Sequence, residues 1–513
     1  MATHNKGPAE LCFMVKTTTD EFNPEDRKLI RSHVMKGKNL GKMRPLGSRR
    51  HLNSADTREN VTLQLSSSGV SSYGRGNRNA SSSRISSSSA PHTERHTGIR
   101  VPESIPPRFG SVASTMCLAD STMKPERVEV VLQFSTIAKQ LLFPMETCIF
   151  FDRRAENWIA PLALDPAFLH ASIFASLYLF DAILPQGSSR ETHRIMYHYH
   201  KTVSILRKRL LFDDDEVRLS NNTVNVVLRL AGHAFSAGDL KSAMNHMQGI
   251  QRIVNLRGGL SSFRGNEKLA AEILRSDLGI VMHSGSNPVL FRGVARRDTY
   301  YQMYPKLSLF LDKRHSLHSS TAGLFISTSA ATHDIELDGQ LTLAWSTMSD
   351  FCSVINLAAD SEQKIDVETF LHSMSSIMYN LLDMNFESCF WKESIRLSLL
   401  SFSCSVFLPW RHLGMKYPHL NSILRRHFTK LKESIPSFPP KLVMWLLMAC
   451  AVTIIDEFDG AWLHRLLREV ANLCGIHCWE QLQDMLMSVM WIGIVHDKPG
   501  KRVFDAAFGC SNI

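Results

Sequence analysis

Residues 246–291 constrain the fold of this chain more than any other stretch. Apolar side chains recur there at helical spacing in two segments, and Gly258-Gly259 separates the two. Glycine adopts positive φ angles without strain, which suits the end of a helix and a tight turn. Asn287-Pro288 follows the second segment, and the residue before a proline is biased away from the helical region. The stretch therefore predicts two amphipathic helices joined by a glycine turn.

The same periodicity recurs along most of residues 126–513, and few segments alternate as strands do. Asp165 is expected to cap a helix that has Pro166 in its first turn. Residues 301–340 break the pattern and predict a long loop or a hinge. The predicted fold class is all-α: a large multi-helix body of one or two lobes. The expected helices cover residues 128–142, 166–180, 191–211, 222–235, 240–256, 267–282, 343–357, 367–383, 394–407, 421–431, 441–455, 459–473 and 480–494.

Positive charge is concentrated on the N-terminal side of this body. The formal net charge is +10, and residues 1–110 hold 18 Lys and Arg against 9 Asp and Glu. Residues 66–89 hold 12 serines, a composition that cannot bury enough apolar surface to fold. We therefore expect a basic segment with one short helix at 1–60, a disordered linker at 61–125, and a helical body at 126–513.

Residues 27–50 form a run of cations without an acidic residue. Such a run can neutralise several phosphates, an interaction that is strong at low salt and weak in sequence discrimination. The same residues would serve equally as a nuclear-import signal or a protein-binding arm. No helix-turn-helix, basic zipper or finger spacing accompanies them. The candidates for contact with nucleic acid or an import receptor are Lys28, Arg31, Lys36, Lys38, Lys42, Arg44, Arg49 and Arg50.

The sequence contains none of the common catalytic motifs. It has no Gly-rich phosphate loop, no H-E-x-x-H and no G-x-S-x-G. His193, His198 and His200 are five and two residues apart, so their rings diverge on a helix. This spacing favours ordinary surface or packing histidines over a metal site. The acidic run of residues 213–216 is expected to cap the next element. We expect no enzymatic activity, no cofactor and no bound metal, with an unrecognised helical active site as the enzymatic alternative.

The ten cysteines are scattered and form no C-x2-C pair. Cys474, His477 and Cys478 lack an evident fourth ligand, which favours buried thiols over a metal site. The first ten residues contain no apolar core of a secretion signal, so a reducing intracellular compartment is expected. The apolar run 442–455 has 14 residues, fewer than the ~20 that span a bilayer. It predicts a core helix, and no membrane partner is expected.

Four blocks of the helical body carry a recognisable pattern. They are His246-x2-Gly249…Leu256-Arg257-Gly258-Gly259-Leu260 with Arg275-Ser276-Asp277-Leu278 and Ser286-Asn287-Pro288; Glu393-Ser394-Ile395-Arg396-Leu397 with Phe407-Leu408-Pro409-Trp410; Tyr417-Pro418-His419-Leu420 with Pro439-Pro440-Lys441-Leu442 and Trp445-Leu446-Leu447-Met448; and Met490-Trp491-Ile492 with His496-Asp497. In this order they resemble the fungal-specific transcription factor domain, the regulatory part of binuclear zinc cluster regulators. Residues 13–35 resemble the start of a subgroup that commonly lacks the zinc cluster. Within the first block, Arg275 and Asp277 are expected to make a buried or half-buried polar contact.

The resemblance implies a nuclear transcriptional regulator or coregulator of a fungal gene set, for example a secondary-metabolite biosynthetic cluster. The helical domain would be its regulatory and interaction platform. Its partners would be other transcription regulators or a second copy as a dimer, and DNA through the basic arm. The family's zinc cluster needs six cysteines in a compact run, whereas residues 1–110 contain only Cys12. This departure leaves a second interpretation, a helical interaction protein that has lost the zinc module and does not bind DNA.

Overall fold

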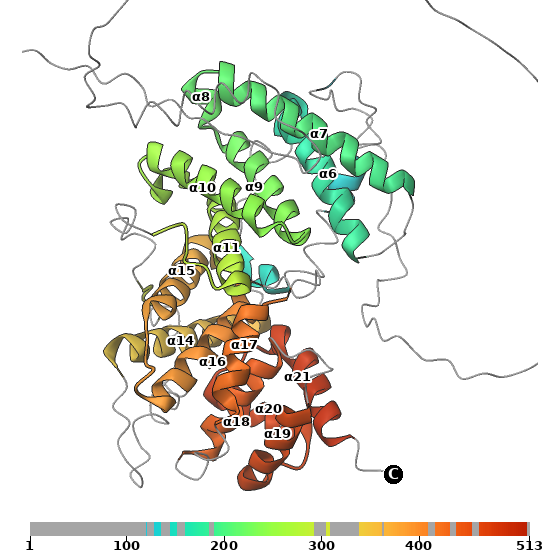
Figure 1. Cartoon of the computed structure of the whole chain (residues 1–513). Coiled ribbons are helices and arrows are strands. Elements are labelled where there is room, and N and C mark those ends of the chain that lie inside the picture. Colours follow the sequence, from blue (N-terminus) through green and yellow to red (C-terminus); the bar gives the residue numbers. More distant parts are fainter. Residues whose placement is uncertain are drawn as a thin grey trace, which may run out of the picture. The chain divides into compact units, whose positions relative to one another are not determined.

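Helices make up nearly all of the regular structure that is described. The computed structural model describes residues 120, 128–134, 144–150, 160–183, 189–291, 304–307, 338–361, 364–408, 416–430, 438–453 and 461–509 (Figure 1). Within these ranges the only strands have two residues each, β1 (Ile149–Phe150) and β2 (Ile365–Asp366). The all-α prediction is therefore confirmed. Apart from Asp120, the segments predicted as a basic arm and a linker lie outside the described residues.

A buried ion pair connects helices near the start of the body, namely α5 (Ala160–Leu164), α6 (Pro166–Ile183) and α7 (Ser189–Phe212). As predicted, Asp165 caps α6, because its Oδ1 accepts a hydrogen bond from the backbone N–H of Phe168 at 3.0 Å. The same oxygen lies 2.6 Å from Nη2 of Arg209 on α7, and both side chains are buried. Because removing one partner would leave an uncompensated buried charge, the pair favours one arrangement of α6 beside α7 (Figure 1).

The next elements are α8 (Asp215–Arg218), α9 (Asn221–Ser236), α10 (Leu240–Leu256), the 3-10 helix η3 (Leu260–Phe263) and α11 (Glu267–Ser284). Gly258 and Gly259 between α10 and η3 have φ angles of 89° and 113°, and Gly285 ends α11 with a φ of 71°. The prediction of two helices joined by a glycine turn is therefore confirmed. The acidic run also acts as predicted, since Asp214 Oδ1 accepts from the backbone N–H of Val217 in α8 at 3.0 Å.

The short strands join distant parts of the chain. β1 follows the 3-10 helix η2 (Pro144–Cys148), and β2 lies between α14 (Gly339–Ser361) and α15 (Val367–Asp383). The two strands pair in parallel, with Ile149 opposite Ile365. The sequence did not indicate this pair, because two residues are too few to show an alternating pattern. The hinge or loop predicted for residues 301–340 lies mostly outside the described residues and stays a prediction.

The C-terminal helices are α16 (Phe390–Phe407), α17 (Pro418–Phe428), α18 (Pro440–Ala451), α19 (Ala461–Cys474), α20 (Trp479–Val489) and α21 (Gly493–Phe508). The predicted helix over residues 480–494 was wrong at its C-terminal end. Met490 has an extended backbone with φ −172° and ψ 110°, so α20 stops before it and α21 begins three residues later. The extended link lets the carbonyl oxygen of Met490 accept a hydrogen bond from Nε1 of Trp445. The helix α21 was not predicted.

Helix α11 joins the earlier helices to the later ones, because it packs against α9 and α10 as well as α15 and α17. Helix α16 packs against α15, α17 and α18, and most of its side chains are buried. In the part of the chain that the structure describes, none of the helices combines the length and the hydropathy needed to cross a membrane.

Candidate functional site

The eight basic residues predicted to contact nucleic acid or an import receptor all lie outside the described residues. They are Lys28, Arg31, Lys36, Lys38, Lys42, Arg44, Arg49 and Arg50. Their role therefore stays a prediction. The described part offers instead a set of buried polar side chains, and several of them belong to the four sequence blocks.

The carboxylate of Asp277 on α11 is the centre of one buried group. Its Oδ1 accepts from the backbone N–H of Val289 at 2.8 Å, and its Oδ2 accepts from the N–H of Leu290 at 3.1 Å. The hydroxyl of Tyr379 on α15 donates to Oδ2 at 2.9 Å. Burial, with the charge of Asp277, raises the pKa of Tyr379 well above its usual range. Asp277 thus connects the segment after Pro288 to both α11 and α15.

Arg275 is the second buried charged residue of α11, with 2% of its surface exposed. Its Nε donates to the carbonyl oxygen of Phe407 at the end of α16, at 3.0 Å. Its guanidinium carbon lies 5.2 Å from the ring centroid of Phe370, within the range of a cation–π contact. The sequence suggested a buried or half-buried polar contact for Arg275 and Asp277. The structure places both in the interior, with bonds from Arg275 to α16 and from Asp277 to α15.

Two further hydrogen bonds join different sequence blocks. Tyr417 donates its hydroxyl proton to the carbonyl oxygen of Leu408 at 2.7 Å, and Nε1 of Trp445 donates to that of Met490 at 2.5 Å. Both donors are buried. Buried polar groups are costly unless they are paired, so these bonds favour one packing of the helices. We refer to Arg275, Asp277, Tyr379, Tyr417 and Trp445 as the polar framework.

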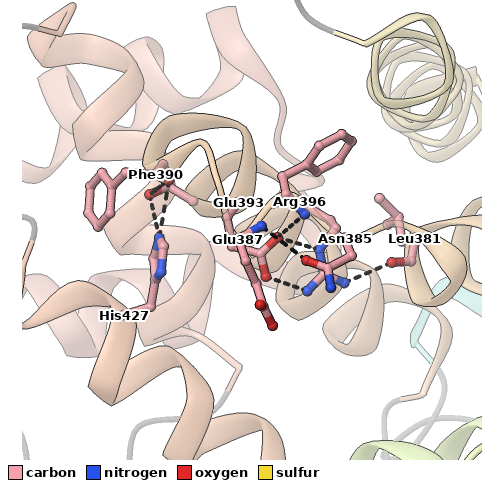
Figure 2. Close-up of polar contacts among 9 residues, drawn as sticks. Leu381, Asn385, Glu387, Phe390, Glu393, Arg396 and His427 are labelled. Atoms are coloured by element: carbon pink, nitrogen blue, oxygen red, sulfur yellow. Dashed lines mark hydrogen bonds and ion pairs between the residues drawn. The ribbon is translucent and has the colours of Figure 1, made fainter.

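Glu393 and Arg396, both at the start of α16, form a third polar group (Figure 2). Nε of Arg396 lies 2.8 Å from Oε2 of Glu393, and Nη2 bonds to Oε1, so the contact is bidentate. Nη1 also donates to the carbonyl oxygen of Leu381 on α15 at 2.8 Å. The backbone N–H of Phe386 donates to Glu393 at 3.3 Å. The pair therefore closes the turn between α15 and α16.

Replacing Arg396 with lysine should lower the free energy of unfolding by about 1–3 kcal/mol, because an ammonium group cannot reproduce the bidentate contact and the bond to Leu381 together. Urea unfolding followed by circular dichroism would measure the change. The matched control is Arg465→Lys, since Arg465 is 70% exposed and makes one 3.3 Å contact with Glu469. Equal shifts in the two variants would contradict a special role for Arg396.

Ser394 and His427 form a close serine–histidine pair between α16 and α17. The serine Oγ lies 2.8 Å from Nε2 of His427 and donates to the carbonyl oxygen of Phe390 at 2.9 Å. Nε2 of His427 is also 3.2 Å from that carbonyl oxygen (Figure 2). A carbonyl only accepts, so this nitrogen carries the hydrogen. A nucleophilic serine needs a nitrogen that accepts its proton. Because Nε2 of His427 already carries a hydrogen, it cannot accept the proton of Ser394, and the pair acts as a contact between α16 and α17.

A second pair, Ser405 and His496, is arranged in the same way. Nδ1 of His496 accepts from the backbone N–H of Ile492 at 3.2 Å, which leaves Nε2 as the donor to Ser405 Oγ at 2.9 Å. The hydroxyl of Ser405 donates in turn to the carbonyl oxygen of Phe402. Burial lowers the pKa of His496 to about 3, so the imidazole is neutral. It connects α16 to α21.

Of the three histidines singled out in the sequence, only His198 is buried, while His193 and His200 are exposed. The partner of His198 is His170 of α6, with their Nδ1 atoms 2.8 Å apart. Nε2 of His170 lies 3.3 Å from Oδ2 of Asp120. The sequence did not indicate His170, because it stands alone in an apolar helix.

The thiols near the C-terminus differ from the prediction. Cys474 and Cys478 are only half-buried, whereas the prediction was that they are buried. Cys474 is the last residue of α19, and Cys478 is the N-cap of α20. Among the described residues, no group of three or more His, Cys, Asp or Glu side chains is placed to hold a metal ion.

Comparison with protein-family models, with curated proteins and with solved structures finds no match for this chain.

Proposed function

We propose that this chain is a nuclear transcriptional regulator or coregulator whose helical body is a regulatory and interaction platform. The proposal rests on the order of the four sequence blocks and on the hydrogen bonds that join them in the polar framework. The concentration of positive charge in residues 1–110 is in keeping with a nucleic-acid partner or with nuclear import. The gene set that the resemblance suggests is fungal, such as a secondary-metabolite biosynthetic cluster.

The role proposed for the body is binding and not catalysis. Its best-placed candidate nucleophiles, Ser394 and Ser405, direct their protons to carbonyl oxygens of their own helix. Beside them lie the half-buried His427 and the buried His496. Burial lowers the pKa of both histidines, which favours the neutral imidazole. Both serine–histidine pairs form contacts between helices, α16 with α17 and α16 with α21. Such contacts suit a body in which the binding of a partner shifts one helix against another.

Chromatin mapping of the tagged full-length protein tests the proposal, together with transcript profiles after deletion of the gene. Enrichment at a defined set of promoters, with altered transcripts of the same genes, is the expected result. A chain lacking residues 1–60 separates the arm from the body in the same experiment. An unchanged transcriptome under inducing conditions, with no chromatin signal, would refute a regulatory function.

If the basic arm contacts DNA, retardation of a labelled duplex by the full-length protein should weaken roughly a thousandfold between about 50 mM and about 200 mM salt. Reversing the charges of Arg49 and Arg50 to glutamate should reduce both the affinity and the salt dependence, because fewer counterions are released. Lys241→Glu/Lys268→Glu is the matched control, as it makes the same charge change on exposed helical residues of the body. An equal loss of DNA affinity in the two double variants would rule out a specific role of Arg49 and Arg50 in binding DNA.

The alternative is an interaction protein that does not bind DNA, and the lack of a six-cysteine run in residues 1–110 favours it. The same mapping experiment separates the two functions. The alternative is favoured if the tagged protein is recovered with partner proteins but stays outside the nucleus. It should then also show no crosslinking to chromatin when those partners are present.

A further inference from the structure

Helix α7 has one face buried and the opposite face open to solvent. Its buried residues are Ile195, His198, Thr202, Leu206, Arg209 and Leu210, which recur at three- and four-residue spacing. They face α6 and α9, the neighbours against which α7 packs (Figure 1). On the opposite side of the helix most side chains are exposed, and Arg194 is half-buried. The exposed ones are Thr192, His193, Met196, Tyr197, His200, Lys201, Ser204, Arg207, Lys208, Leu211 and Phe212. We call them, together with Arg194, the outer face of α7.

Basic residues recur on the outer face in adjacent pairs at seven-residue intervals. The pairs are His193-Arg194, His200-Lys201 and Arg207-Lys208. Seven residues are close to two helical turns, so successive pairs lie about 10.5 Å apart on the same side of the helix. The sequence from Thr192 to Phe212 contains no Asp or Glu. Arg194, Lys201, Arg207 and Lys208 supply four formal positive charges, so the outer face carries a regular row of basic residues.

Large apolar side chains lie among these cations. Met196 is 40% exposed, Tyr197 and Leu211 are each 45% exposed, and Phe212 is 81% exposed. A phosphate backbone would neutralise the basic pairs but would leave these side chains in water. A partner that covers both kinds of side chain must itself carry acidic and apolar groups in alternation along about 30 Å.

The spacing points to a helical partner. A second helix that packs along α7 repeats its contacts every seven residues, which is the interval of the basic pairs. The acidic run of residues 213–216 follows the row directly and would repel an acidic partner. The cationic surface therefore ends at Phe212, which limits the bound helix to about three heptads.

We propose that the outer face of α7 is a docking surface for an acidic amphipathic helix of a protein partner, with acidic residues at heptad spacing. The acidic side chains pair with the basic pairs, and the apolar side chains of the partner cover Tyr197, Leu211 and Phe212. Acidic segments with interspersed apolar residues are often disordered alone and fold on binding, at a cost in ordering that the apolar contacts offset. This inference goes beyond the proposed regulatory function and does not require it.

The test uses full-length protein and a fluorescent synthetic helix of three heptads, with glutamates at the matching positions and leucines between them. Anisotropy titration should show saturable binding, and Lys201→Glu/Lys208→Glu should weaken it by at least about tenfold. Lys241→Glu/Lys268→Glu has the same net charge and should bind within about twofold of the unchanged protein. Lys201 and Lys208 are exposed, so the fold should persist, and circular dichroism checks this.

Two further comparisons decide between classes of partner. Phe212→Ser leaves the charge unchanged and should weaken the peptide several-fold without affecting a duplex of DNA. A peptide of the same composition in scrambled order should bind much more weakly than the heptad peptide. No binding of the heptad peptide, equal binding of the scrambled one, or tighter binding of DNA that depends on the same lysines would each overturn the proposal. The last result would identify a surface for nucleic acid.

Discussion

Replacement of Asp277 by alanine is expected to lower the free energy of unfolding by about 3–5 kcal/mol. The carboxylate is 1% exposed and accepts from the N–H groups of Val289 and Leu290 and from the hydroxyl of Tyr379. Its removal would leave these three donors without their acceptor in or near the interior. Domains are stable by only about 5–15 kcal/mol, so the variant should unfold at a much lower urea concentration.

Tyr379→Phe separates the parts of this effect. It removes one donor and keeps the two backbone contacts of Asp277, so a loss of about 1–2 kcal/mol is expected. The control is Asp484→Ala, because Asp484 is exposed on α20 and its loss should leave the urea midpoint unchanged. If Asp277→Ala were as stable as this control, the carboxylate would have no part in holding α11, α15 and the segment after Pro288 together.

Acid should destabilise the helical body from about pH 6.5 downwards. Burial lowers the pKa of His496 to about 3 and that of His246 to about 4, whereas an unfolded histidine titrates near 6.5. Above pH 6.5 these two imidazoles are neutral in the folded and in the unfolded chain, so their titration does not lower the free energy of unfolding. Between pH 6.5 and the folded pKa values the unfolded chain binds the protons. Each histidine then lowers the free energy of unfolding by about 1.4 kcal/mol per pH unit.

Urea titrations at several values between pH 7 and pH 5 would measure this slope. His496→Asn keeps an acceptor near the N–H of Ile492 and loses the bond to Ser405, so it should be less stable at pH 7 and depend less steeply on pH. The difference in slope should be about 1.4 kcal/mol per pH unit. His193→Asn, at an exposed position of α7, should keep the slope of the unchanged protein. An unaltered slope in His496→Asn would mean that this histidine is not held neutral in the folded protein.

Helices with strong local signals were predictable from the sequence. The predicted ranges 240–256 and 367–383 match α10 and α15, because each begins next to an aspartate that caps it. Asp239 accepts from the N–H of Ser242 and Asp366 from that of Thr369. Such contacts lie within a few residues along the chain, which makes them visible in the sequence.

Contacts between distant residues explain the failures. Helix α21 contains Pro499 and Gly500, residues that disfavour a helix interior. A side-chain carbon at Gly500 would lie 2.7 Å from the ring of Trp479, so glycine is needed there for α20 and α21 to pack. The break after α20 likewise depends on Trp445, which is 45 residues earlier in the sequence than Met490. No local pattern shows either requirement.

The same reasoning applies to the polar framework. The sequence suggested a buried or half-buried polar contact for Arg275 and Asp277, and the structure places both in the interior. It did not indicate their partners, since Tyr379 is 102 residues from Asp277 and Phe407 is 132 from Arg275. The basic arm presents the opposite case: its charge is evident in the sequence, and its residues lie outside the described part of the chain.

The two-residue pairing of β1 with β2 has a consequence for synthesis of the chain. Ile149 pairs with Ile365, so more than 200 residues must leave the ribosome before β1 finds its neighbour. The adjoining helix η2 carries the buried Met145 and Cys148 and packs against α14 and α21. Helix α14 is made just before β2, and α21 is made later than β2. At typical translation rates this wait is roughly 10 to 40 seconds. During that interval the apolar side chains of η2 lack their native neighbours, and we expect a chaperone or the ribosome surface to shield them from other chains. A chain truncated after α11 should therefore aggregate.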